Sequence, residues 1–191
     1  MHTGDLGVVQ AFAGRALDEL CNEWPGEVAI QSKVNQLWLA IKSKYEENQC
    51  NNKLSMLKRE MFHRQEDFPI LKAKAAESRA LLFTLRDICA DLHDGSDRDE
   101  HRARCFASLT SVYTIFQSAD VVLTDAESKS ALEHYNTFLL HYNWLLKRSL
   151  SQGVRRYGVY YKFHNMWHIV DQSKWLNPIY TWCYDFESFM G

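Results

Sequence analysis

The chain has few of the residues that interrupt helices and none of the cysteine patterns of small secreted or zinc-binding folds. Only eight glycines and three prolines occur in 191 residues, which favours a fold built mostly from α-helices. The five cysteines are odd in number, widely spaced and never arranged as C-x-x-C, which disfavours a disulfide framework and a zinc ribbon. We therefore expect reduced thiols in an intracellular protein.

Long apolar runs and the signatures of common catalytic sites are also missing. No apolar stretch approaches the roughly 20 residues that a membrane-spanning helix needs, and the first residues lack the pattern of a secretory signal peptide. The net charge of −2 provides no overall attraction to nucleic acid or to anionic membranes. No G-x-S-x-G, phosphate-binding P-loop, dinucleotide fingerprint or H-E-x-x-H motif occurs. We expect no membrane partner.

Apolar residues at the helical period predict most of the fold. They indicate helices over about 5–23, 28–47, 54–64 and 70–92. The most polar stretch, HDGSDRDEH (93–101), is expected to form an exposed loop before a further helix that carries Leu109 and Phe116.

Thr124 and Glu127 have the spacing of a capping box and predict the start of a later helix. Gly153 can adopt the left-handed conformation that ends such a helix. We expect this helix to be the longest in the second half of the chain. Its buried face is predicted to contain five residues: Leu132, Tyr135, Leu139, Tyr142 and Leu146.

The expected fold class is mostly α, an irregular multi-helix domain of about six or seven helices. At most one short β segment is predicted, near Val159 to Phe163 in the C-terminal third. The chain contains six Trp, nine Tyr and ten Phe, which crowd its second half and indicate a thick core or a stacking surface there. We divide it into a helical region, 1–153, and an aromatic-rich segment, 154–191.

Between Glu133 and Asp171 the chain has no acidic residue, and we call residues 134–170 the acid-free window. Four tyrosines lie in it, Tyr142, Tyr157, Tyr160 and Tyr161, together with five key cations: Lys147, Arg148, Arg155, Arg156 and Lys162. Cations that contact phosphates, with rings that pack on bases or sugars, suit nucleic-acid binding. We predict weak, sequence-tolerant DNA binding by these five cations. The alternative is a solvated basic loop next to an acidic neighbour.

His164 and His168 lie four residues apart, a spacing that places two imidazoles on one face of a helix. A metal site would need a third ligand, which Asp171, Cys183 or Glu187 would have to supply. The alternative is a pair of packed, hydrogen-bonded histidines in an aromatic layer.

The two ends of the chain resemble transposases of the CACTA (En/Spm) type and their transposon-derived relatives. At the C-terminal end the resemblance consists of two histidines, an Asn-Pro step and an aromatic run with a glutamate: His164, His168, Asn177, Pro178, Trp182, Tyr184, Phe186, Glu187 and Gly191. The opening MHTGDLGVVQAFAG is similar to a segment of the same proteins in which Met-His precedes a helix. The helices between the two ends would correspond to the family's helical insertion.

This resemblance implies part of a ribonuclease-H-like core, in which three acids hold two Mg²⁺ ions for DNA strand cleavage and transfer. Glu187 matches the third catalytic acid, and it would be a metal ligand only together with upstream acids. The supporting residues would be His164, His168, Trp182 and Tyr184. The family's upstream aspartates would lie before Met1, so we expect a fragment or remnant. Alone, it should be inactive as a nuclease and should bind no Mg²⁺ cofactor.

Three functions are open at this point. The first is a transposase-derived helical domain that contacts DNA. A protein of that origin would be intracellular and nuclear, and the missing upstream catalytic segment would be a further partner. The second is a helical protein-interaction module without a nucleic-acid role, whose aromatic half packs against a protein partner. The third, a small metal-dependent enzyme that uses His164, His168 and Glu187, is disfavoured because the upstream acids are missing.

Overall fold

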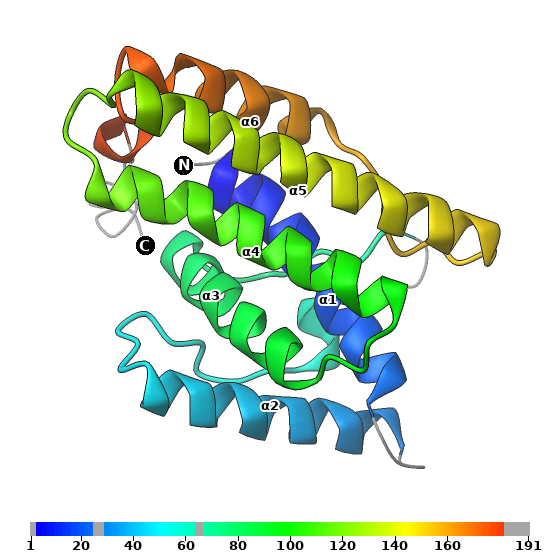
Figure 1. Cartoon of the computed structure of the whole chain (residues 1–191). Helices are drawn as coiled ribbons and strands as arrows, with labels where there is room; N and C mark the ends of the chain where they lie inside the picture. The colour runs from blue at the N-terminus through cyan, green and yellow to red at the C-terminus, as the bar shows by residue number, and fades with distance from the viewer. Residues whose placement is uncertain (1–2, 25–28, 64–66, 182–191) are drawn as a thin grey trace.

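The computed structural model describes residues 3–24, 29–63 and 67–181, which form a bundle of six α-helices (Figure 1). The helices are α1 (Gln10–Glu23), α2 (Ile30–Glu47), α3 (Ala75–Asp91), α4 (Asp97–Ser118), α5 (Asp125–Ser151) and α6 (Tyr161–Asp171). A π-helical turn, Gly4–Val9, leads into α1, and short 3-10 turns lie at Arg59–Met61, Gln172–Lys174 and Pro178–Thr181. The described residues contain no strand, and the prediction of a mostly α multi-helix fold is confirmed.

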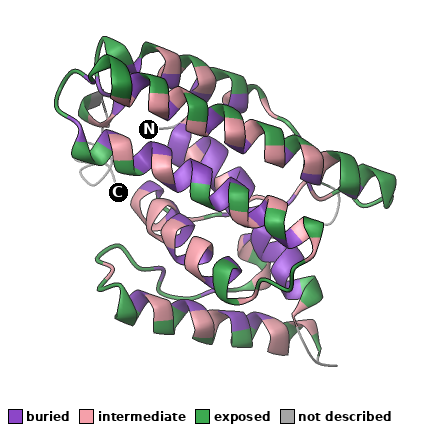
Figure 2. Ribbon diagram, viewed as in Figure 1, coloured by how far each residue is buried: buried purple, intermediate pink, exposed green. Residues whose placement is uncertain are grey.

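Helix α1 lies at the centre of the bundle, between α3 and the α4–α5 pair (Figure 1). Every residue from Ala11 to Cys21 is buried, and Figure 2 shows the burial concentrated along this helix and on the inner faces of its neighbours. The ring of Phe12 lies 4.5 Å from that of Phe106 and 5.5 Å from that of Phe138, measured between ring centroids. Aromatic pairs of this geometry stabilise a core beyond their buried area.

Helix α5 begins with the predicted capping box. The backbone N–H of Glu127 donates to Thr124 Oγ1 at 3.2 Å, and the backbone N–H of Thr124 donates to Glu127 Oε2 at 2.8 Å. At the other end Gly153 has a φ of 68°, as expected for a residue that follows a helix. At 27 residues, α5 is the longest helix described in the second half of the chain, as predicted.

The buried face of α5 differs in part from the prediction. Tyr135 and Tyr142 are buried as expected, but the three predicted leucines, Leu132, Leu139 and Leu146, are only partly buried. The other buried residues of this face are Ser128, Ala131, Phe138, Leu145 and Ser149. Helix α5 packs against both α4 and α6, so the centre of its buried face lies between these two helices. The three predicted leucines lie at the edge of that face.

The predicted helix over 54–64 is wrong. In its described residues, 54–63, only the 3-10 turn Arg59–Met61 forms, because the backbone of this region is bonded to the segment that follows it: Ile70 N donates to Phe62 O, and Lys72 N donates to Met61 O. The same pairing delays α3, which begins at Ala75 rather than near residue 70.

The segment around Leu71 also packs closely against α1. Leu71 N donates to Gln10 O at 2.9 Å, and a Cβ atom on Gly14 would lie only 2.4 Å from Leu71 N. The contact therefore requires a residue without a side chain at position 14. The helical spacing of apolar residues within 54–64 carries no information about the contact between Leu71 and α1.

One further expectation is corrected. The loop predicted over 93–101 is shorter, because α4 begins at Asp97 and Ser96 Oγ accepts from Asp99 N at 3.3 Å as an N-cap. The prediction allowed at most one short β segment near Val159 to Phe163, and the described residues there form no strand, since α6 begins at Tyr161. The ring of Phe163 stacks on Phe138 of α5, with the centroids 6.0 Å apart, so this segment is fixed by side-chain packing. None of the helices in the described ranges is long and apolar enough to cross a membrane.

Candidate functional site

Three of the five cations predicted to bind DNA are exposed near the C-terminal end of α5. They are Lys147, Arg148 and Arg155, and none forms an ion pair with another described residue. The guanidinium of Arg148 lies 5.4 Å from the ring centroid of Trp144. This end of α5 extends past the neighbouring helices (Figure 1). Cations near a helix C-terminus also interact favourably with the helix dipole, so their position has a structural explanation as well.

Arg156 is bound within the protein. Its Nε lies 3.2 Å from Asp18 Oδ2 and its Nη1 lies 3.6 Å from Glu19 Oε1, and its side chain is 13% exposed. Both acids belong to α1, almost 140 residues earlier in the chain. The alternative interpretation of a basic residue beside an acidic neighbour therefore applies to Arg156, and the distance in sequence explains why no local pattern indicated the pair.

Lys162 and most of the predicted tyrosines are also engaged in internal contacts. Lys162 Nζ donates to the carbonyl of Leu6 at 3.3 Å. Tyr142 and Tyr157 are buried, and Tyr160 is partly buried. Tyr161 is 71% exposed and is the one ring among the four that is available for stacking on a base.

His164 and His168 share a face of α6, as the spacing predicts, with their Nε2 atoms 3.0 Å apart and both side chains exposed. The two rings are hydrogen-bonded to each other, as the alternative expected, but both side chains are exposed rather than packed in an aromatic layer. Among the residues that the structure describes, no group of three or more His, Cys, Asp or Glu side chains is arranged to hold a metal ion. Glu187, Cys183, Trp182 and Tyr184 lie outside the described ranges.

A buried ionic cluster that the sequence did not indicate joins α1 to α4. Arg102 Nη2 lies 2.7 Å from Asp99 Oδ1, and Arg102 Nη1 lies 3.1 Å from Glu19 Oε2. Only 3% to 5% of each of these three side chains is exposed. Glu23 completes the cluster, with Oε1 2.8 Å from Arg98 Nη1 and Oε2 3.5 Å from Arg102 Nη1. Buried charges persist only when they are paired in this way.

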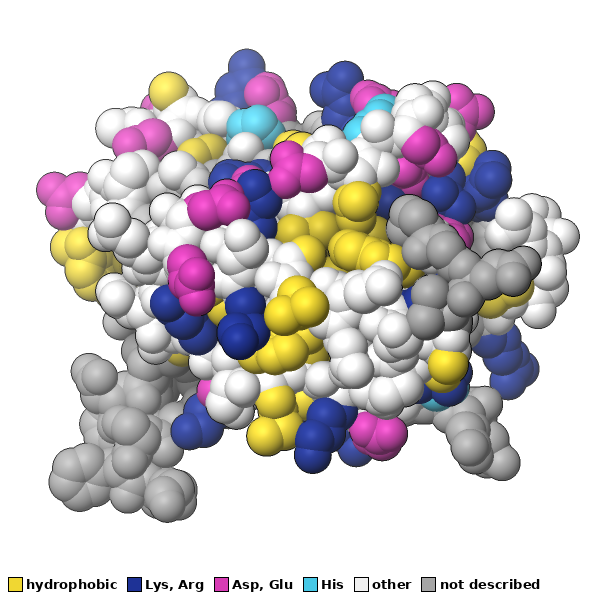
Figure 3. All heavy atoms as spheres, turned by 90° about the horizontal axis from the view of Figure 1, so that it is seen from below, with side chains coloured by type: hydrophobic (Ala, Val, Ile, Leu, Met, Phe, Trp, Pro, Cys, Tyr) yellow, Lys and Arg dark blue, Asp and Glu magenta, His cyan; other side chains and the backbone are white. Residues whose placement is uncertain are grey.

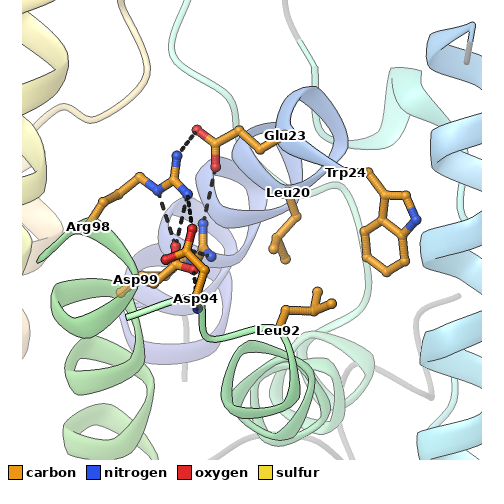
Figure 4. Close-up of a pocket in the computed structure, with 8 residues that line it drawn as sticks. Leu20, Glu23, Trp24, Leu92, Asp94, Arg98 and Asp99 are labelled. Atoms are coloured by element: carbon orange, nitrogen blue, oxygen red, sulfur yellow. Dashed lines mark hydrogen bonds and ion pairs between the residues drawn. The ribbon is translucent and has the colours of Figure 1, made fainter. Parts of the chain in front are cut away.

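A cavity of about 150 Å³ opens beside this cluster (Figure 4). Glu23, Arg98 and Asp94 lie on one side of it, Trp24 lies on the other, and Leu20 and Leu92 point between them. Burial raises the pKa of Glu23, and the charge of Glu19 raises it further. Hydrogen bonds from Ser96 lower the pKa of Asp94 to about 2. The charged groups are paired with one another, so the cavity presents no nucleophile activated by a free base.

Arg15 of α1 is fully buried among four aromatic rings. Its guanidinium carbon lies 4.8 Å from the ring centroid of Tyr160 and 5.7 Å from that of Phe68, with Tyr142 and Phe163 also within 6 Å. Arg15 Nη1 donates to the hydroxyl of Tyr142, whereas Nε and Nη2 have no hydrogen-bond partner among the residues that the structure describes. Cation–π contacts thus replace part of the hydration of this charge.

Apolar side chains are exposed where the α4–α5 loop meets the chain that follows α6. We call this region the apolar end surface and define it by five residues: Val121, Val122, Trp175, Leu176 and Tyr180. They are five of the twelve large hydrophobic residues exposed in the described ranges. Trp175 is 74% exposed and Tyr180 is 57% exposed. These five are the large hydrophobic residues exposed in the two described segments 119–124 and 172–181.

Buried Asn177 holds the two parts of this surface together. Its backbone N–H donates to Val121 O at 2.8 Å, and its side-chain Nδ2 donates to Phe116 O at 2.8 Å and to Asp120 O at 3.1 Å. One amide side chain thus satisfies carbonyl groups at the C-terminal end of α4, which have no partner within the helix. The surface is consequently fixed rather than carried on an unsupported loop.

The face of the molecule that α2 covers, at the bottom of Figure 1, is mixed in character. Figure 3 shows apolar side chains in its centre, surrounded by charged side chains of both signs. In α2 and the segment that follows it, Leu39 and Met56 are the exposed large hydrophobic residues. This face offers fewer exposed apolar anchors than the apolar end surface.

Comparisons with protein-family models, with curated proteins and with solved structures find no match to the chain.

Proposed function

We propose that the domain is a helical protein-interaction module that binds its partner at the apolar end surface. The observation that carries this proposal is the exposure of Trp175 and Tyr180 beside three aliphatic residues on a support fixed by Asn177. Contiguous exposed apolar side chains mark interaction sites, and Trp and Tyr are enriched among the residues that dominate binding energy. A rigid support reduces the conformational entropy that binding costs.

The charges near this surface define the chemistry of the partner. Asp120, Asp125 and Asp171 lie beside it in the chain and form no ion pair with another described residue. Lys174 is the neighbouring cation, and its Nζ lies 5.7 Å from the ring centroid of Trp175. A partner with complementary charge would combine apolar anchors with lysines or arginines. The fitting class is a basic amphipathic helix.

The test is a binding screen with a library of synthetic amphipathic helical peptides that differ in charge but keep the same apolar face. We expect the basic members to bind and the acidic members to fail. The variant Trp175→Ala should weaken binding at least about tenfold, as expected for an aromatic hot spot. Leu39→Ala is the matched control, because Leu39 is equally apolar and 62% exposed but lies on α2. Equal binding by Trp175→Ala and wild type would refute the proposal.

A second candidate, DNA contact by a transposase-derived domain, is favoured by the exposed cations Lys147, Arg148 and Arg155. Three phosphate contacts would give a slope of roughly −2.7 for log affinity against log salt on duplex DNA. Arg155→Ala should reduce this slope by about one unit without changing the fold. Lack of detectable binding at about 50 mM salt would remove this candidate.

A further inference from the structure

Two histidines from different helices meet between α4 and α5. The Nδ1 atoms of His101 and His141 lie 2.8 Å apart, and the centroids of the two rings are 4.8 Å apart. The ring of His101 is stacked on Trp144, with a centroid distance of 4.0 Å and an interplanar angle of 3°. The stacking fixes the direction of His101, and the short contact is a hydrogen bond in which one Nδ1 donates to the other.

This separation fits two nitrogen ligands of one metal ion. Metal–imidazole bonds are about 2.0–2.1 Å long, so two nitrogens at the right angle of a square-planar Cu²⁺ or Ni²⁺ ion lie about 2.9 Å apart, whereas the tetrahedral angle at Zn²⁺ would separate them by about 3.3 Å. Imidazole must be neutral to bind a metal. Partial burial lowers the pKa of both histidines, and His101 and Arg104 lower that of His141 further. Asp97 and Glu100 act in the opposite direction.

We propose that His101 and His141 form a site for a divalent ion that prefers imidazole in a square-planar arrangement, namely Cu²⁺ or Ni²⁺. The ion would bind to both Nδ1 atoms in place of their hydrogen bond, with each neutral ring carrying its proton on Nε2, and would link α4 to α5. Water would complete its coordination. Affinity should follow the usual order for nitrogen ligands, with Cu²⁺ bound most tightly. This site is separate from the apolar end surface and does not depend on the proposed protein interaction.

His164 and His168 form a second pair that must be removed before the site can be tested. Their Nε2 atoms lie 3.0 Å apart, but both belong to α6 and both side chains are exposed. The full chain with His164→Ala and His168→Ala therefore serves as the background protein. Metal bound by this background cannot come from the second pair.

The experiment measures Cu²⁺ and Ni²⁺ binding to the background protein by calorimetry, with Zn²⁺ as the tetrahedral comparison ion, which should bind more weakly. We expect one ion per chain, with affinity reduced at least about tenfold by His141→Ala. His101→Phe should cause the same loss, and it keeps an aromatic ring on Trp144 if His101→Ala fails to fold. His134→Ala is the matched control, since His134 lies on α5 two turns before His141 and is also partly buried.

Fluorescence provides a second measurement that locates the ion. Bound Cu²⁺ should quench the emission of Trp144, which touches His101, and Trp144→Phe should remove most of that quenching. No metal binding by the background protein would overturn the proposal. Binding that is unaffected by both His101→Phe and His141→Ala would overturn it as well.

Discussion

The hydroxyl of Tyr157 donates a hydrogen bond of 2.8 Å to Glu19 Oε2, across 138 positions of the chain. Glu19 also contacts Arg102 of α4 and Arg156 of the segment after α5. A single carboxylate on the central helix therefore connects α1 to two later parts of the chain. Because the carboxylate is almost completely buried, each lost partner leaves a charge that water cannot solvate.

We predict that Tyr157→Phe lowers the free energy of unfolding by about 2 kcal/mol, the usual contribution of a hydrogen bond to a charged group. The ring is kept, so the change removes only the hydroxyl. Urea denaturation followed by circular dichroism gives the measurement. Tyr161→Phe is the matched control, because Tyr161 is 71% exposed, and it should leave the free energy of unfolding unchanged. An equal effect of the two substitutions would show that the hydrogen bond to Glu19 contributes no stability.

The part of the fold that could be predicted from sequence is the part fixed by nearby residues. The cap of α5 depends on Thr124 and Glu127, which are three residues apart, and it was predicted at the correct position. The pairing of Phe62 with Ile70 was missed, since each backbone partner lies in another segment.

The same distinction applies to the candidate site. The spacing of His164 and His168 correctly predicted that the two side chains share one face of a helix, because this depends only on residues four positions apart. The acid-free window described charge along the chain, whereas Arg156 is neutralised by Asp18 from the first helix. The meeting of His101 with His141 likewise follows from the packing of α4 on α5, which no spacing within either helix specifies.

Arg155 and Arg156 are adjacent in sequence but should respond differently to replacement by alanine. Arg156→Ala leaves Asp18 and Glu19 short of a cation, and we expect it to destabilise the fold by about 3 kcal/mol, as when a buried ion pair loses one partner. Arg155 is exposed, so Arg155→Ala should change the free energy of unfolding by less than about 0.5 kcal/mol. Chemical denaturation of both variants provides the comparison. Equal stability of the two would contradict the internal role assigned to Arg156.

Glu23 should make stability depend on pH in a direction opposite to that of most carboxylates. Its pKa is raised in the folded protein, so the folded state holds the proton more tightly than the unfolded state. Its contribution to stability is therefore most favourable at low pH and falls as the pH rises through the unfolded and then the folded pKa. We expect Glu23→Gln to be more stable than wild type at pH 7 and to lose this advantage at about pH 4. Thermal unfolding at the two pH values tests this, and an advantage that grows on acidification would contradict it.

Arg15 is fully buried, and two of its N–H-bearing nitrogens lack hydrogen-bond partners among the described residues. Methionine has a similar length, carries no charge and packs well against rings, so Arg15→Met removes the cost of burying the guanidinium. We expect the free energy of unfolding of this variant to be about 1 kcal/mol higher than that of wild type, including the loss of the cation–π contacts. Arg15→Ala is the informative comparison. It removes the same charge but leaves a cavity among Phe68, Tyr142, Tyr160 and Phe163, and it should destabilise the fold by about 3 kcal/mol. Urea denaturation of the three proteins measures both effects. If Arg15→Met were as unstable as Arg15→Ala, the guanidinium itself would be stabilising the core through its contacts with the four rings.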